Sequence, residues 1–189
     1  MGATVTIQEL NNGSVGNPVY TDITSTVFQT RDNISDPNYD YPIPIPDSGY
    51  HYSYWKAFCL NFTGDFTKIS NIRFYCQNDS LGAWTLGTGG EVVVAVKDSA
   101  PHGIPNSSYQ PASGTEGTTG DEITAAHPHY SNVTNISNFH SVDTALVIDN
   151  NSYDSPGRSY HAVFQVKVAS DATQGVMPNI SFVFVWDEI

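Results

Sequence analysis

The histidines, cysteines and carboxylates of this 189-residue chain are the side chains best able to carry out chemistry. His127 and His129 flank Pro128, and histidines two positions apart on an extended chain point to the same face, where they could chelate a transition metal. Residues 149–154 are rich in oxygen ligands suited to Ca²⁺, although they lack the Gly and the distal Glu of an EF-hand loop. Polar loops explain both patterns more simply, so we expect no metal and no other cofactor.

Catalytic signatures do not occur in the sequence. It contains no phosphate-binding glycine loop, no dinucleotide fingerprint, no Gly-x-Ser-x-Gly elbow and no His-Glu-x-x-His. Cys59 has apolar neighbours, which do not favour a reactive thiolate. A carboxylate-based hydrolase is the remaining enzymatic alternative, with candidate carboxylates near strand ends at Asp65, Asp79, Asp187 and Glu188. We predict that the chain is not an enzyme.

Charge and hydropathy disfavour several classes of partner. The formal net charge is −12, with seven Lys and Arg against nineteen Asp and Glu, so we expect neither nucleic-acid binding nor attraction to anionic membranes. No run of about 18 apolar residues is present, and no transmembrane helix is predicted. The first residues lack the pattern of a signal peptide, so we expect Cys59 and Cys76 to be buried free thiols.

The hydrophobic pattern has the period of β-strands, and no window sustains a helical repeat. A turn is predicted at residues 11–14, and strands are predicted over residues 3–10, 27–30, 54–62, 68–77, 91–97, 145–148, 160–169 and 180–189. Short strands separated by turns are typical of antiparallel sandwiches. We predict a single all-β domain over residues 1–189: an antiparallel β-sandwich, jelly-roll-like, with a Pro-rich N-terminal arm.

The last ten residues, 180–189, form the clearest strand signal in the chain. β-branched and aromatic residues dominate them, and they contain neither Gly nor Pro. Left in water, such a segment would be an aggregation hazard. We therefore expect it to be paired within a sheet, with three or four of its large side chains buried.

Two segments interrupt the strand pattern. Residues 36–47 include Pro42, Pro44 and Pro46, which remove backbone donors and favour polyproline II. We predict an extended surface arm or sheet edge here, which packs either on a neighbouring subunit or on its own domain. Residues 98–122 are rich in Ser, Gly, Pro and Thr and are predicted to form a long loop.

Three further segments carry patterns that extend beyond a single strand. Residues 55–75 contain a strand that ends in a Gly turn, followed by Ile69-Ser70-Asn71-Ile72-Arg73-Phe74. Residues 160–168 are followed by Ala172-Thr173-Gln174-Gly175, and the chain closes with Phe182-Val183-Phe184-Val185-Trp186-Asp187-Glu188. In this order the segments resemble a loose family of virion structural proteins of tailed phages. The resemblance implies a small β-rich particle component.

On this resemblance we expect a non-enzymatic virion structural protein, assembled in the host cytoplasm, of the capsid decoration, cement or head–tail accessory type. It would act through symmetric contacts with capsid or tail subunits and with further copies of itself, as trimers or larger rings. We place these contacts in the N-terminal strand, the Pro-rich arm and an aromatic cluster, with ordinary packing within the domain as the alternative for each. The residues are Val5, Ile7, Tyr39, Tyr41, Ile43, Ile45, Tyr50, Tyr52 and Tyr54.

A carbohydrate-binding or receptor-binding module is the alternative function. It requires exposed aromatic rings on which sugars can stack, and Trp84 and Tyr54 are the candidates.

Overall fold

The larger of two antiparallel sheets forms the spine of the molecule. The computed structural model describes residues 2–32, 40–77 and 81–189. Within these ranges the larger sheet has the strand order β2-β1-β4-β12-β6-β9, with β11 beside β4 and β3 beside β12. Its strands are β1 (Thr4–Ser14), β2 (Asn17–Ile23), β3 (Tyr50–Tyr52), β4 (Lys56–Thr63), β6 (Glu91–Val96), β9 (Asn132–Asn135), β11 (Gly157–Arg158) and β12 (Ala162–Ala169).

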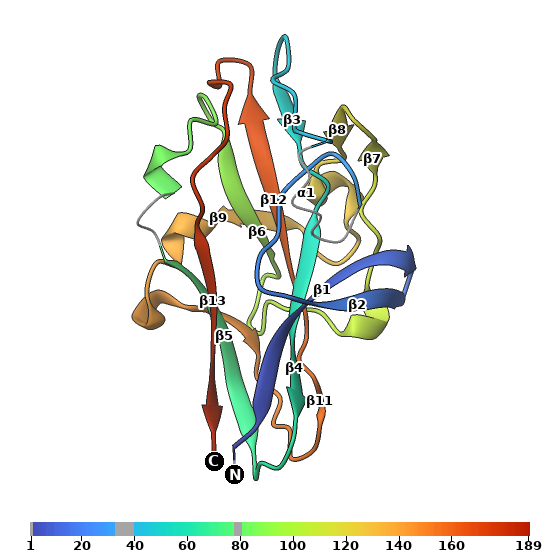
Figure 1. Cartoon of the computed structure of the whole chain (residues 1–189), viewed down its shortest axis with the longest axis vertical. Coiled ribbons are helices and arrows are strands. Elements are labelled where there is room, and N and C mark those ends of the chain that lie inside the picture. Colours follow the sequence, from blue (N-terminus) through green and yellow to red (C-terminus); the bar gives the residue numbers. More distant parts are fainter. Residues whose placement is uncertain (1, 33–39, 78–80) are drawn as a thin grey trace.

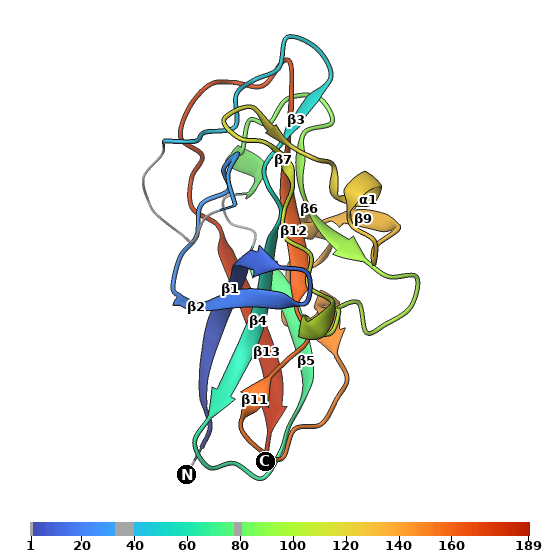
Figure 2. The ribbon, with the colours of Figure 1, turned by 90° about the vertical axis from the view of Figure 1, so that its right-hand side faces the viewer.

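The smaller sheet has the order β10-β5-β13 and faces the larger one (Figure 1). Its strands are β5 (Ile69–Gln77), β10 (Leu146–Asp149) and β13 (Ser181–Glu188), and a separate ribbon pairs β7 (Gly114–Thr115) with β8 (Thr119–Gly120). β4 and β12 of the larger sheet and β5 and β13 of the smaller sheet run along the long axis of the molecule (Figure 2). The predicted all-β antiparallel sandwich is confirmed, while its jelly-roll order stays a prediction.

Short helices lie in the connections between strands. They are η1 (Leu81–Ala83), η2 (Asn106–Ser108), α1 (Ile123–Ala126), η3 (Ile136–Asn138) and η4 (Val142–Thr144).

Alternating side chains on β4, β5 and β12 build the core between the two sheets. Phe58 of β4, Phe74 of β5 and Phe164 of β12 are buried there, and the Phe74 and Phe164 ring centroids lie 4.7 Å apart. Phe182 of β13 joins this cluster, with its ring centroid 4.9 Å from that of Phe164. Burying each such side chain contributes roughly 1.5–3 kcal/mol.

A second apolar layer covers the opposite face of the larger sheet. Trp55, Cys59 and Val163 point to that face and pack in one cluster with Ile104 and Tyr109. The last two residues come from the segment 98–122, which was predicted as a long loop and which contains η2 and the β7–β8 ribbon. The central strands of the larger sheet are therefore covered on both faces.

The predicted C-terminal strand is present as β13, which pairs with β5 along its length. The pairing continues to the last residue, because Ile189 N donates to Lys68 O at 3.0 Å. The expected depth of burial is wrong, since Phe184 is the one large side chain of β13 that is buried, and Phe182 and Trp186 are half-buried. The reason is that β13 is an edge strand with β5 as its neighbour.

Two local predictions near the N-terminus are also wrong. Residues 11–14 do not form the turn, because β1 continues through them to Ser14, and the reversal follows at Val15 and Gly16. Asn12 and Gly13 have φ values of 48° and 79°, and the register with β2 shifts there, as in a β-bulge. Residues 27–30 are irregular instead of forming a strand.

Cys59 and Cys76 are free and 0% exposed, which confirms the predicted buried thiols. Burial raises the pKa of the Cys59 thiol to about 12 and that of the Cys76 thiol to about 11.

Candidate binding cleft between the two sheets

A cleft of about 1090 Å³ opens between the two sheets beside β13. Three segments of irregular backbone form its walls, namely residues 24–29, 41–45 and 172–180. Side chains of the sheets form its floor, among them Ile7, Phe58, Val166 and Phe184. The cleft is therefore an extension of the sandwich core that reaches the surface.

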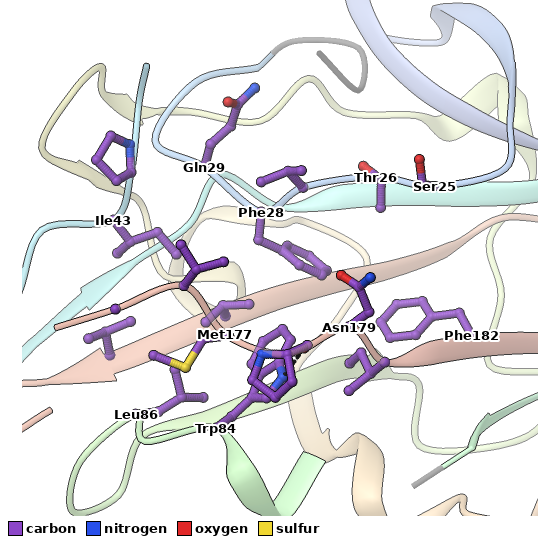
Figure 3. A pocket seen from close by; sticks show the side chains of 18 of the residues that line it. Ser25, Thr26, Phe28, Gln29, Ile43, Trp84, Leu86, Met177, Asn179 and Phe182 are labelled. Carbon is purple, nitrogen blue, oxygen red and sulfur yellow. Dashed lines mark hydrogen bonds between the residues drawn. The ribbon is translucent and has the colours of Figure 1, made fainter. Parts of the chain in front are cut away.

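Apolar and aromatic side chains dominate the lining (Figure 3). Phe28 points into the cleft from the first wall, and its ring centroid lies 6.2 Å from that of Phe182. Trp84 and Leu86 lie across the cleft from Phe28. The polar lining residues are neutral, and they include Ser25, Thr26, Gln29, Thr173 and Asn179.

Charged side chains do not line the cleft within the described ranges. No Asp, Glu, Lys, Arg or His is among its lining residues there. General acid–base catalysis needs such a group within hydrogen-bonding reach of the reacting atoms, whereas binding of an apolar group needs only a dry, shaped wall. The geometry of the cleft therefore suits recognition of an apolar surface or ligand.

Hydrogen bonds from the larger sheet and its connections hold the wall at residues 172–180. Trp84 Nε1 donates to Pro178 O at 2.7 Å, and Thr173 N donates to Thr85 O at 3.0 Å. Two apolar residues of the cleft lining are exposed: Val176 in this wall is 78% exposed and Ile45 in the wall at residues 41–45 is 37% exposed. The rim thus presents apolar side chains to solvent from two of the three walls.

The described part of the predicted Pro-rich arm, residues 40–47, lies against its own domain. Thr30 N donates to Tyr41 O at 2.9 Å, and His51 Nδ1 lies 2.8 Å from Pro44 O. Ile43 packs against the inter-sheet core. Backbone carbonyls are thus the anchoring groups of this segment, which fits a proline-rich chain that has few N–H donors of its own.

The predicted contact residues occupy different environments. Ile7, Tyr41, Ile43 and Ile45 line the cleft, and Val5 is half-buried on β1. Tyr39 lies outside the described residues.

The three tyrosines of the predicted cluster at residues 50–54 are not among the residues that line the cleft. Tyr50 is 42% exposed, and the Lys167 ammonium lies 4.1 Å from its ring centroid. Tyr52 is half-buried, and burial raises its pKa to about 12. Tyr54 is 8% exposed, so its ring offers little surface to a partner or to a sugar.

The candidate metal-binding residues act as structural groups. His127 is 3% exposed and packs against Trp55 and Tyr130, and burial lowers its pKa to about 4. Asp149 is fully buried, and its carboxylate accepts hydrogen bonds from Tyr153 Oη at 2.6 Å and from Tyr160 N at 2.7 Å. Among the described residues, no group of three His, Cys, Asp or Glu side chains could hold a metal ion.

Two features of the structure were not predicted from the sequence. The first is the wall at residues 172–180, which follows the predicted strand over residues 160–169 and for which no role was predicted. The second is a buried ion pair between Glu9 and Lys56. Glu9 did carry a signal, because it follows Val5 and Ile7 at alternate positions and so falls on the apolar face of β1.

Comparison of the chain with models of protein families, with curated proteins and with solved structures finds no match. In the described part of the chain, no helix has the length and apolar character needed to cross a membrane.

Proposed function

We propose that the chain is a non-enzymatic structural protein of a virus particle, of the capsid decoration or head–tail accessory type. The observation that carries the proposal is the wide, uncharged, apolar cleft between the sheets. An apolar recess of this size at the surface of a β-sandwich is typical of a site that receives another apolar group. The resemblance of three sequence segments to phage virion proteins supplies the particle context.

In this function the cleft and its rim receive an apolar segment of a neighbouring capsid or tail subunit, or of another copy of the chain. Val176 and Ile45 make the first contacts because they are exposed and belong to two different walls of the cleft. Repetition of the contact around a symmetric ring or shell multiplies a weak single interaction. The net charge of −12 keeps the protein from packaged nucleic acid and directs it to the particle exterior.

The carbohydrate-binding alternative has less support from the geometry. Tyr54 is 8% exposed, and the indole N–H of Trp84 already donates to Pro178 O. A sugar-stacking platform needs an open ring face with a polar edge that is free to pair.

The first experiment measures the mass of the purified protein by light scattering behind a sizing column, and its binding to particles assembled without it. We expect trimers or larger rings, or saturable binding to such particles. Ile45→Asp and Val176→Asp place a charge at the rim and should reduce assembly or binding at least tenfold, because a buried unpaired charge costs several kcal/mol.

Val142→Asp is the matched control, since Val142 is 48% exposed and lies on η4 outside the cleft lining. Its assembly and binding should equal those of the unmodified chain. A chain that stays monomeric, fails to bind particles and instead binds glycans would overturn the proposal in favour of the alternative.

A further inference from the structure

A buried ion pair joins β1 and β4 next to the cleft. Lys56 Nζ lies 2.5 Å from Glu9 Oε1, and the two side chains are 4% and 0% exposed. The second carboxylate oxygen of Glu9 accepts a hydrogen bond from Thr26 Oγ1 at 2.7 Å, which fixes the carboxylate in place. A buried ion pair is often no more stabilising than apolar residues of similar volume, so stability alone does not account for it.

A carboxamide completes the cluster. Asn11 is 2% exposed, and its Nδ2 lies 3.5 Å from the same Glu9 Oε1 atom that contacts Lys56. Asn11 Oδ1 is buried and has no hydrogen-bond partner among the described residues. An amine, a carboxamide and a carboxylate therefore meet in a site that is closed to water.

Strand register explains why these three residues meet. β1 and β4 are antiparallel with Leu10 opposite Ala57, and continuing this register by one residue places Asn11 opposite Lys56. Glu9 lies two positions before Asn11 and thus on the same face of β1. Phe164 of β12 is paired with Lys56 on its other side. The carboxyl group of Asp32 lies near enough to interact electrostatically with both Lys56 and Glu9.

We propose that Lys56 and Asn11 become joined by an intramolecular amide bond, with Glu9 as the general base and proton carrier. The inference is independent of the proposed virion function, because it concerns a modification that the chain carries out on itself. Its substrates are its own side chains, and it needs no oxidant, reductant or cofactor.

The reaction balances as follows. The Lys56 ammonium gives a proton to the Glu9 carboxylate across the 2.5 Å contact, which leaves a neutral amine. The Nζ lone pair attacks Cγ of Asn11, the new Nζ–Cγ bond forms, and one further Nζ proton passes through Glu9 to Nδ2. The Cγ–Nδ2 bond then breaks with its electron pair on nitrogen. Ammonia leaves and takes the remaining proton from Glu9 as ammonium, so Glu9 is again a carboxylate.

A second set of the same three residue types provides an internal comparison. Lys167 Nζ lies 3.8 Å from Glu91 Oε1, and Asn135 Nδ2 donates to Glu91 Oε2 at 3.2 Å. The Lys167 and Glu91 side chains are 22% and 30% exposed, so water solvates their charges. Transfer of a proton from Lys167 to Glu91 therefore lacks the dry environment that favours neutral partners, and no bond should form there.

The experiment is intact-protein mass spectrometry of the denatured, reduced chain, followed by peptide mapping. The protein without substitutions should be lighter than the mass calculated from its sequence by one ammonia molecule. The peptide map should contain a branched peptide that joins Lys56 to Asn11. Asn11→Ala, Lys56→Met and Glu9→Gln should each restore the full calculated mass. Lys167→Met, the control at the exposed set, should keep the loss of ammonia.

Several outcomes would overturn the inference. One is that the chain without substitutions keeps the full mass calculated from its sequence after prolonged incubation. Another is a linkage at residues other than Lys56 and Asn11. A Glu9→Gln chain that is linked as completely as the unmodified protein would remove Glu9 from its role. The decisive mass is that of the chain without substitutions, so the test does not depend on whether each variant folds.

Discussion

Gln165 and Ser53 brace the junction between the larger sheet and the layer that covers it. Gln165 Nε2 donates to Ser53 O at 2.8 Å, and Ser53 Oγ accepts from the adjacent Val166 N at 3.0 Å. Both side chains are 0% exposed. Gln165 also donates to Asp121 O at 2.8 Å and accepts from Ile123 N at 3.0 Å, so one buried amide ties β12 to two further segments.

Replacement of Gln165 by Leu should be strongly destabilising. It leaves Ser53 O and Ile123 N without this partner in the interior and Asp121 O without it in a part-buried position, and each buried loss costs about 1 kcal/mol or more. We expect the free energy of unfolding to fall by about 3 kcal/mol, measured by urea denaturation. Gln77→Leu, at an exposed end of β5, should change it by less than about 0.5 kcal/mol. Equal effects of the two variants would contradict the role of Gln165.

Acid should destabilise the protein through two buried histidines. Burial lowers the pKa of His127 to about 4 and that of His161 to about 3, from an ordinary value of 6.5. At a pH between the folded-state pKa and the ordinary pKa of 6.5, the unfolded chain binds protons that the folded chain does not. The contribution of each histidine to the free energy of unfolding is therefore fully present above about pH 6.5 and is lost as the pH falls. Each histidine should contribute a slope of about 1.4 kcal/mol per pH unit in this window.

The check is a series of denaturation curves between pH 7 and pH 4. A His127→Gln variant should show a shallower loss of stability over this window than the unmodified chain. His140→Gln should leave the slope unchanged, because His140 is exposed. A slope that is identical in all three chains would contradict the assignment.

The two cysteine thiols should be unreactive in the folded protein. Both are 0% exposed, and burial raises the pKa of each, so thiolate is scarce at neutral pH. We expect labelling by a disulfide reagent to be at least a hundredfold slower in buffer than in denaturant. Ser170→Cys adds an exposed thiol that should react at once. Fast labelling of Cys59 or Cys76 would show that the core opens readily.

The indole hydrogen bond of Trp84 should be needed to hold the part of the wall around Pro178 in place. Trp84→Phe keeps an aromatic ring in the cleft but removes the donor to Pro178 O. The loss should cost about 1 kcal/mol and should increase protease cleavage within the wall. Trp186→Phe, a matched change on β13, should leave the cleavage pattern of the wall unaltered. Protection of the wall in Trp84→Phe would show that other contacts hold it.

The sequence was informative where burial imposes a simple period. Phe58, Leu60 and Phe62 alternate on β4, and such alternation predicts a strand with one face in the core. Asn12 and Gly13 were misread because left-handed residues serve a tight turn and a β-bulge equally well. The choice between the two depends on the pairing partner β2, which local sequence does not specify.

The cleft could not be predicted, because it forms where segments far apart in the chain meet. Phe28 comes from an irregular segment and its ring lies beside that of Phe182 on β13, and neither this segment nor the wall at residues 172–180 has a regular period that would indicate its position. Lys56 and Glu9 could be recognised individually as charges on apolar faces. Their contact required the register of β1 against β4, which follows from the fold as a whole.

The two-sided covering of the larger sheet has a consequence for motion. Amide groups of β4 and β12 lie beneath packed layers on both faces, whereas β13 has a single strand neighbour and β10 pairs with β5 over a few residues. In deuterated water, the central amides should exchange only when the whole domain unfolds, and those of β13 and β10 should exchange earlier through partial opening. The smaller sheet would then be the part that opens locally while the larger sheet stays folded.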